Sequence, residues 1–209
     1  MFKGEYAGKN VAEQNKKILI LGESHYGDVT TTKSVIEHFY KCPDDKSYRF
    51  FHKIAECFCG KNKNINEEFV NFWDKVYFAN YIDENCGVQD CKAKNLLEVE
   101  QNRKNYNNEL FEFINKNGID TVFVFSRLVY NYLPSCSENE HEEKITNVNN
   151  ENLFVGKSRD YISLVVYLKD EQHKHVDVIL NKDIKVYGFR HPSAACGFKI
   201  DNYRSVCKM

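Results

Sequence analysis

The sequence contains no apolar run near the roughly 20 residues that a membrane-spanning helix requires. Its first ten residues, MFKGEYAGKN, lack the apolar core of a signal peptide. We therefore expect a cytoplasmic protein. No internal repeat and no linker-like stretch divides the 209 residues. Because domains typically contain roughly 100–200 residues, we predict a single domain over residues 1–209.

The sequence also lacks an excess of charge of either sign. It has 29 Lys and Arg residues against 30 Asp and Glu residues, which gives a formal net charge of −1. Proteins that bind duplex DNA usually have a strongly basic face. This composition provides no overall positive field, so binding of a polyanion would require a local basic patch.

The eight cysteines do not form a C-x-x-C pair anywhere in the chain. The two closest pairs are Cys57 with Cys59 and Cys86 with Cys91. A structural zinc site usually needs two well-spaced ligand pairs, and disulfides are typical of small secreted chains. We therefore expect reduced thiols, no metal and no cofactor.

Four short apolar runs, each bounded by polar or turn residues, predict β-strands. These runs are residues 18–21, 76–79, 121–125 and 185–189. Their residues are apolar at successive positions, without alternation, which is typical of strands buried on both faces. Such strands form parallel sheets that are covered by helices on each side.

Segments with helical spacing separate these strands. We predict helices over residues 34–40, 47–58, 96–115, 127–132 and 160–168. The last segment is rich in β-branched residues, which leaves a strand open as the alternative. Residues 136–157 are rich in Asn, Glu and Lys and indicate a solvated excursion. The pattern predicts an α/β fold, a three-layer α/β/α sandwich with a mainly parallel, roughly four-stranded central sheet.

Polar clusters follow three of the predicted strands. Gly22-Glu23-Ser24-His25-Tyr26-Gly27 follows the first strand, Asn80 closes the second, and Arg190-His191-Pro192-Ser193 follows the fourth. In a parallel sheet all three clusters would meet at one edge, where α/β proteins bind ligands. Gly22 would allow the chain to turn, and the neighbouring side chains offer a carboxylate, a hydroxyl, an imidazole and an amide.

These motifs resemble those of the uracil-DNA glycosylase superfamily. Its members have a first motif after strand one (GQDPYH in one branch, GEAPG in another), an Asn at the end of a central strand, and an HPS motif after the last strand. The corresponding residues here are Gly22–Tyr26, Asn80 and His191–Ser193, in the same order between residues 16 and about 198. Phe123–Arg127 matches a further strand that is followed by a small residue and a helix.

The resemblance implies hydrolysis of an N-glycosidic bond in nucleic acid or in another ligand that contains a nucleobase. Glu23 would position or activate water, and His191 would stabilise the departing base. Tyr26 would stack on the base, and Asn80 would recognise its polar edge. The remaining motif residues would line the substrate site; they are Gly22, Ser24, His25, Pro192 and Ser193. A base in a duplex would first have to be flipped out. We expect a monomer.

Two alternatives remain open at the level of sequence. Ser24 stands where the GQDPYH branch has its catalytic Asp, so only Glu23 can supply the carboxylate, and His25 replaces the motif proline. The chain could therefore be a non-catalytic module that binds a base or nucleic acid, which the neutral net charge favours slightly. The segment around Ser24 also partly matches the G-x-S-x-G nucleophile elbow of serine hydrolases, although its second glycine is one position late.

Overall fold

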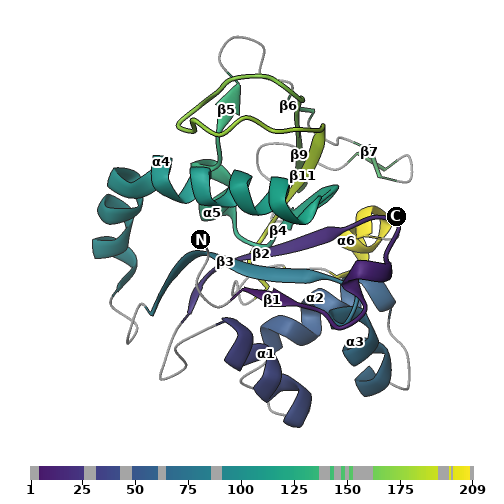
Figure 1. The fold of residues 1–209 in the computed structure, drawn as a ribbon. Helices are drawn as coiled ribbons and strands as arrows, with labels where there is room; N and C mark the ends of the chain where they lie inside the picture. The colour runs from purple at the N-terminus through teal and green to yellow at the C-terminus, as the bar shows by residue number, and fades with distance from the viewer. Residues whose placement is uncertain are drawn as a thin grey trace.

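The computed structural model describes residues 5–25, 32–42, 49–60, 65–85, 91–136, 142–143, 147–148, 151–152, 162–192, 198 and 200–207. Within these ranges the protein has an α/β fold built on one seven-stranded sheet (Figure 1). The strand order in the sheet is β1-β3-β2-β4-β11-β9-β6. The strands are β1 (Tyr6–Ala7), β2 (Ile18–His25), β3 (Tyr77–Asn85), β4 (Thr121–Val124), β6 (Glu142–Glu143), β9 (Ile162–Tyr167) and β11 (Ile184–Phe189).

The sheet is mixed rather than mainly parallel. The four strands predicted from the apolar runs, β3, β2, β4 and β11, lie side by side and are parallel. Strand β1 adds to this group antiparallel on one side, and β9 and β6 add antiparallel on the other. The prediction of a roughly four-stranded sheet was therefore wrong in extent, because the two-residue strands β1 and β6 are too short to show a pattern in the sequence.

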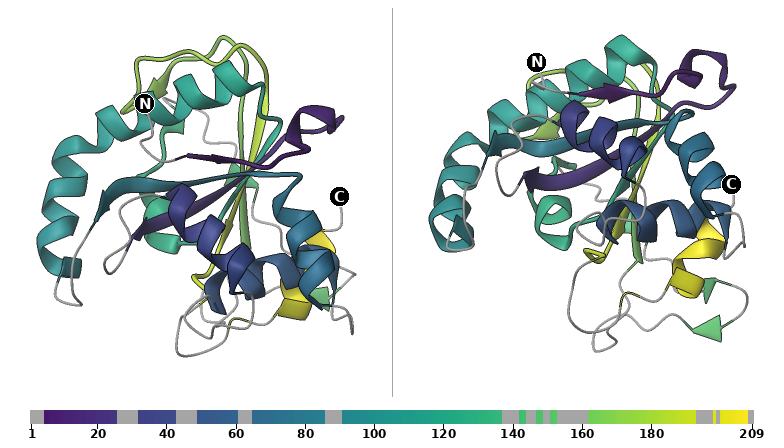
Figure 2. Two further views of the ribbon diagram at one scale, coloured as in Figure 1. Left: turned by 60° about the horizontal axis from the view of Figure 1, so that its bottom comes forward. Right: turned by 90° about the horizontal axis from the view of Figure 1, so that it is seen from below.

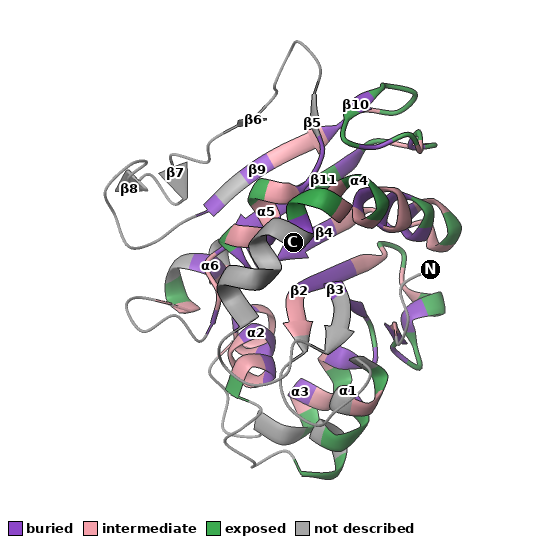
Figure 3. Ribbon diagram, turned by 90° about the vertical axis from the view of Figure 1, so that its left-hand side faces the viewer, coloured by how far each residue is buried: buried purple, intermediate pink, exposed green. Residues whose placement is uncertain are grey.

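Helices cover both faces of the sheet (Figure 2). On the first face, here called the α2 face, lie α1 (Thr32–Lys41), α2 (Arg49–Cys59), α3 (Ile65–Trp73) and α6 (Ile200–Cys207). On the second, the α5 face, lie α4 (Cys91–Asn117) and α5 (Arg127–Tyr132). The buried central strands explain the continuous apolar runs, because residues on both faces pack against helices (Figure 3).

Alternate residues of β2 illustrate this double burial. Ile20 packs with Phe78 on the α2 face, whereas Leu19 and Leu21 pack with Val122 on the α5 face. All of these side chains are almost completely buried. The alternation means that consecutive residues near the end of β2 also face opposite sides of the sheet.

Four of the predicted helices are confirmed as α1, α2, α4 and α5, with residues 47–48 of the second prediction outside the described residues. For the segment 160–168, the predicted helix was wrong and the strand that remained as the alternative is confirmed, since residues 162–167 form β9. Its β-branched residues suit a strand, and pairing with β11 along six residues decides the outcome. Helices α3 and α6 were not predicted.

The predicted excursion over residues 136–157 lies mainly outside the described residues. Its described parts are the two-residue strands β6, β7 (Asn147–Val148) and β8 (Glu151–Asn152), together with the end of β5 (Ser135–Cys136). Strand β5 pairs with β10 (His173–Lys174), and β7 pairs with β8. None of the helices in the described ranges is long and apolar enough to cross a membrane.

Candidate functional site

The described part of the first motif, Gly22 to His25, belongs to a strand rather than to a turn. Strand β2 continues through Gly22 to His25, and Gly22 pairs in register with Asn80 of β3. Ser24 pairs with Ile82, after which the register shifts. Asn80 therefore lies inside β3 and does not close it. The prediction that Gly22 turns the chain was wrong because its neighbour β3 extends equally far and continues to pair with β2.

Gly22 instead provides space for the Asn80 side chain. A Cβ atom at Gly22 would lie only 2.4 Å from Oδ1 of Asn80 and 3.3 Å from Cζ of Phe78. Any larger residue would push the Asn80 amide away. Asn80 is buried, with 5% of its surface exposed. Phe78 belongs to the α2 face, so the Asn80 amide lies on this face, directly beside the glycine backbone.

His191 lies on the same face as Asn80, next to an aromatic residue of α2. Its ring centroid is 5.1 Å from that of Phe50, and the two ring planes are tilted by 33°. Phe50 in turn contacts Phe78, with 6.3 Å between the ring centroids. Phe50 thus connects the imidazole to the residue beside the Asn80 amide. In the sequence, Phe50 belongs only to the predicted helix over residues 47–58, and nothing local links it to His191.

Glu23 occupies the opposite, α5 face of the sheet. The hydroxyl of Ser126 donates a hydrogen bond of 2.8 Å to Oε2 of Glu23. The same hydroxyl accepts a bond from the backbone N–H of Val129, so Ser126 is the N-cap of α5. Ser126 is itself buried. The only sequence signal for this role was a serine placed directly before a predicted helix.

The structure therefore divides the predicted site into two parts. Gly22, Asn80 and His191 belong to the α2 face together with Phe78 and Phe50. Glu23 is held on the α5 face by Ser126. Pro192, the residue after His191, is buried, and its carbonyl accepts a hydrogen bond from Lys53. Tyr26 and Ser193 lie outside the described residues, as does the side chain of His25.

The α2-face group has the chemistry needed to bind a flat polar ring. The Asn80 amide can donate and accept hydrogen bonds at the same time, which matches the edge of a nucleobase. Phe50 provides an aromatic ring, and His191 can donate a hydrogen bond to developing negative charge. Ser24, in contrast, lies within β2, whereas a nucleophile elbow requires a sharp turn from strand to helix.

The described cysteines do not suggest a metal site. The described ranges contain no group of three or more His, Cys, Asp or Glu side chains that could hold a metal ion. The thiol of Cys57 donates to the Lys53 carbonyl oxygen. Burial, together with the nearby Glu68 carboxylate, raises the pKa of Cys59 to about 11.

Comparison with known proteins adds no relative: no protein-family model matches the chain, and no curated protein matches it. The assignment of a function therefore depends on the geometry of these residues and on the motif pattern.

Proposed function

We propose that the protein is a divergent nucleobase glycosylase with a uracil-DNA glycosylase-like, three-layer α/β/α fold. The main support is the contact of the buried Asn80 amide with Gly22, next to Phe78, Phe50 and His191. Four central parallel strands with helices on both faces are consistent with that fold. The substrate would be uracil or another modified base in nucleic acid.

Recognition of the base would depend on Asn80 and Phe50. The amide group of Asn80 pairs with the polar edge of the base, donating from its nitrogen and accepting at its oxygen. Its oxygen lies close to Gly22, where a Cβ atom would come within 2.4 Å of it. The ring of Phe50 offers a stacking surface, and base–aromatic stacking contributes about 1–3 kcal/mol per base. A single-stranded substrate fits the net charge of −1 better than a duplex.

Cleavage would break the bond between C1′ of the sugar and the base nitrogen. The electron pair of this bond leaves with the base, and His191 stabilises the resulting anion with a hydrogen bond. A water molecule attacks C1′ and transfers its proton to the Glu23 carboxylate, which requires the sugar to extend to the α5 face, opposite the Asn80 amide. Ser126 orients this carboxylate through the bond to Oε2. The products are the free base and an abasic sugar.

The test measures free base released from single-stranded oligonucleotides that carry uracil or another modified base. The wild-type chain is compared with Glu23→Gln, His191→Ala and Asn80→Ala variants. The proposal expects release by the wild-type chain and a loss of at least about a hundredfold in the first two variants. Lys116→Met, which changes an exposed residue of α4, serves as the control. Equal release by all variants would contradict the proposed roles.

A second candidate function is a binding module that retains the base-recognition residues without catalysis. The placement of Glu23 on the α5 face, away from the face that holds Asn80, supports this candidate. It expects saturable binding of a base or oligonucleotide that is weakened by Asn80→Ala, with no base released from any substrate. Release of free base that is lost in Glu23→Gln would instead favour the enzyme.

A further inference from the structure

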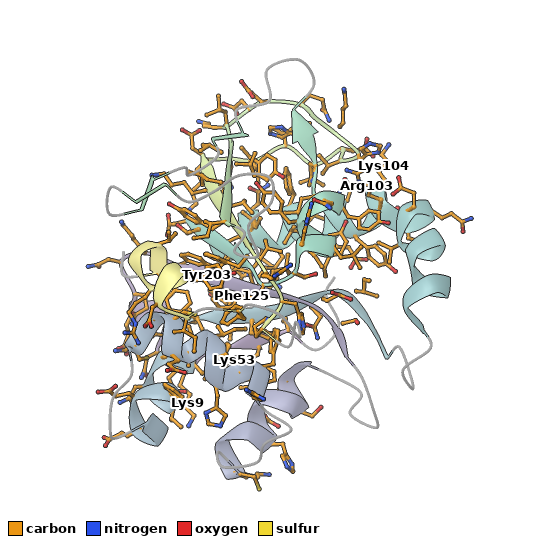
Figure 4. All side chains as sticks on the ribbon, turned by 180° about the vertical axis from the view of Figure 1, so that it is seen from behind. Lys9, Lys53, Arg103, Lys104, Phe125 and Tyr203 are labelled. Atoms are coloured by element: carbon orange, nitrogen blue, oxygen red, sulfur yellow. The ribbon has the colours of Figure 1, made fainter. Side chains whose placement is uncertain are left out.

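Lys53 connects helix α2 to the chain directly after His191. It lies three residues after Phe50, and Figure 4 shows it on the side of the sheet away from Arg103 of α4. Its Nζ atom donates a hydrogen bond to the carbonyl oxygen of Pro192. The same atom lies 5.6 Å from the centroid of the Phe198 ring. One ammonium group therefore contacts the chain at Pro192 and again six residues later.

This location is unfavourable for a positive charge. Burial lowers the pKa of Lys53, and the nearby guanidinium of Arg49 lowers it further, while Glu56 acts in the opposite direction. A surface lysine could avoid these costs by extending into water, as lysine side chains usually do. Here the ammonium instead bonds a backbone carbonyl. The hydrogen bond to Pro192 offsets part of the free energy that burial of the ammonium and its repulsion by Arg49 cost.

Helix α2 thus supports the His191 segment at two points. The side chain of Phe50 contacts the imidazole ring, and the side chain of Lys53 holds the carbonyl of the next residue. Residues three apart lie on the same side of a helix, so both contacts come from one side of α2. Loss of the Lys53 contact would leave the Pro192 carbonyl without this anchor, although the contact between the Phe50 and His191 rings would remain.

We propose that Lys53 is a positioning residue that fixes the His191 imidazole against Phe50 and so orients it toward the departing base. This role rests on the proposed glycosylase function. Lys53 acts through the backbone at Pro192 and does not itself touch the substrate. The proposal expects the orientation of the His191 ring, and the rate of the chemical step, to depend on a donor at position 53.

The test compares Lys53→Met, Lys53→Arg and the wild-type chain by two methods. NMR follows the imidazole ring protons of His191, which are assigned from their loss in a His191→Gln spectrum. We expect these resonances to shift in Lys53→Met and to return toward their wild-type positions in Lys53→Arg, which keeps a donor. Kinetics use the oligonucleotide from which the wild-type chain releases base. They should show kcat reduced on the order of tenfold to a hundredfold in Lys53→Met, with KM little changed.

Lys116→Met is the matched control, because it removes an exposed lysine of α4 and should change neither measurement. Unshifted His191 resonances in Lys53→Met would overturn the proposal. An unchanged kcat in Lys53→Met, with a wild-type chain that releases base, would overturn it as well. If the wild-type chain releases no base, the glycosylase proposal fails. The role of Lys53 in positioning His191 is still supported if the His191 resonances shift in Lys53→Met and return to their wild-type positions in Lys53→Arg.

Discussion

The hydroxyl of Ser126 donates a hydrogen bond to Oε2 of Glu23, joining residues 103 positions apart in the chain. It also caps helix α5 by accepting from the N–H of Val129. One side chain thus determines both where α5 begins and how the Glu23 carboxylate is oriented. This relationship connects the local structure of β4 and α5 to the proposed water-activating residue in β2.

Replacement of Ser126 by Ala should therefore affect stability and function together. Loss of the cap should reduce the free energy of unfolding by about 0.5–2 kcal/mol, as measured by urea denaturation. Glu23→Gln retains an oxygen that can accept from Ser126, so we expect its unfolding free energy to stay close to that of the wild type. If Ser126→Ala unfolds at the same urea concentration as the wild-type chain, the proposed cap contributes nothing.

Replacement of Gly22 by Ala tests the space reserved for Asn80. The added methyl group would lie 2.4 Å from Oδ1 of Asn80, so the amide must move. We expect a loss of about 1–3 kcal/mol in unfolding free energy, together with weaker base binding. The double variant Gly22→Ala/Asn80→Ala should recover stability relative to Gly22→Ala alone, because the clash disappears. Additive effects in this double-mutant cycle would show that the two side chains do not compete for space.

Asp120 should make stability depend on acid pH. Its Oδ2 accepts from the backbone N–H of Lys17, and its Oδ1 from Nζ of Lys182, both in short bonds of 2.7 Å and 2.6 Å. Burial acts to raise the pKa of Asp120, but the hydrogen bonds and charges of Lys182 and Lys17 together lower it. A lowered carboxyl pKa contributes stability that is present above the usual pKa of about 4 and is lost as pH falls further.

Asp120→Asn should therefore be less stable than the wild-type chain at pH 7, by about 1 kcal/mol or less because the pair is partly exposed. The difference should shrink as pH falls below 4, and urea denaturation between pH 7 and pH 3 would measure it. A difference that stays constant over this range would mean that ionisation of Asp120 is unimportant.

His173 should produce a pH dependence at higher pH. It is buried on the α5 face between the rings of Tyr167 and Phe111, with centroid distances of 5.0 Å and 5.9 Å. Burial lowers its pKa, and this effect outweighs the opposing influences of Glu171 and the Leu168 backbone. The unfolded chain therefore binds a proton more readily than the folded chain, and stability falls as pH decreases below about 6.5.

His173→Phe keeps the aromatic contacts but removes the titrating group. We expect the decline in melting temperature between pH 7 and pH 5 to be smaller in this variant than in the wild-type chain. His175→Phe, which changes an exposed histidine two residues away, is the control. An equal decline in all three chains would assign the pH dependence to other groups.

The sequence predicted the elements whose pattern is local and strong. The four apolar runs correspond to the four parallel strands. Their residues are apolar at successive positions because neighbours such as Leu19 and Ile20 are buried on opposite faces of the sheet. Whether residues 162–167 form a helix or a strand depends on their pairing with β11. This is a tertiary contact that the local sequence pattern does not reveal. The strand character of Gly22 to His25 likewise followed from the neighbouring β3.

The candidate site shows the same limit. Motif order singled out Asn80 and His191, but it assigned Asn80 to the end of its strand, whereas Asn80 lies inside β3. It could not show that Phe50 contacts His191, which is more than 100 residues away, nor that Lys53 holds Pro192 across 139 positions. It also did not show that Gly22 and Glu23 face opposite sides of the sheet, although consecutive residues of a strand do so.

The central claim is that the Asn80 amide recognises a nucleobase beside Gly22. The most direct measurement is an NMR titration that follows the side-chain amide signals of Asn80, assigned from an Asn80→Asp spectrum, as a uracil-containing oligonucleotide is added. The account predicts saturable shifts of these signals, together with shifts of the His191 ring, that are absent with an oligonucleotide lacking the base at that position. Binding of the oligonucleotide without any change in the Asn80 signals would contradict it.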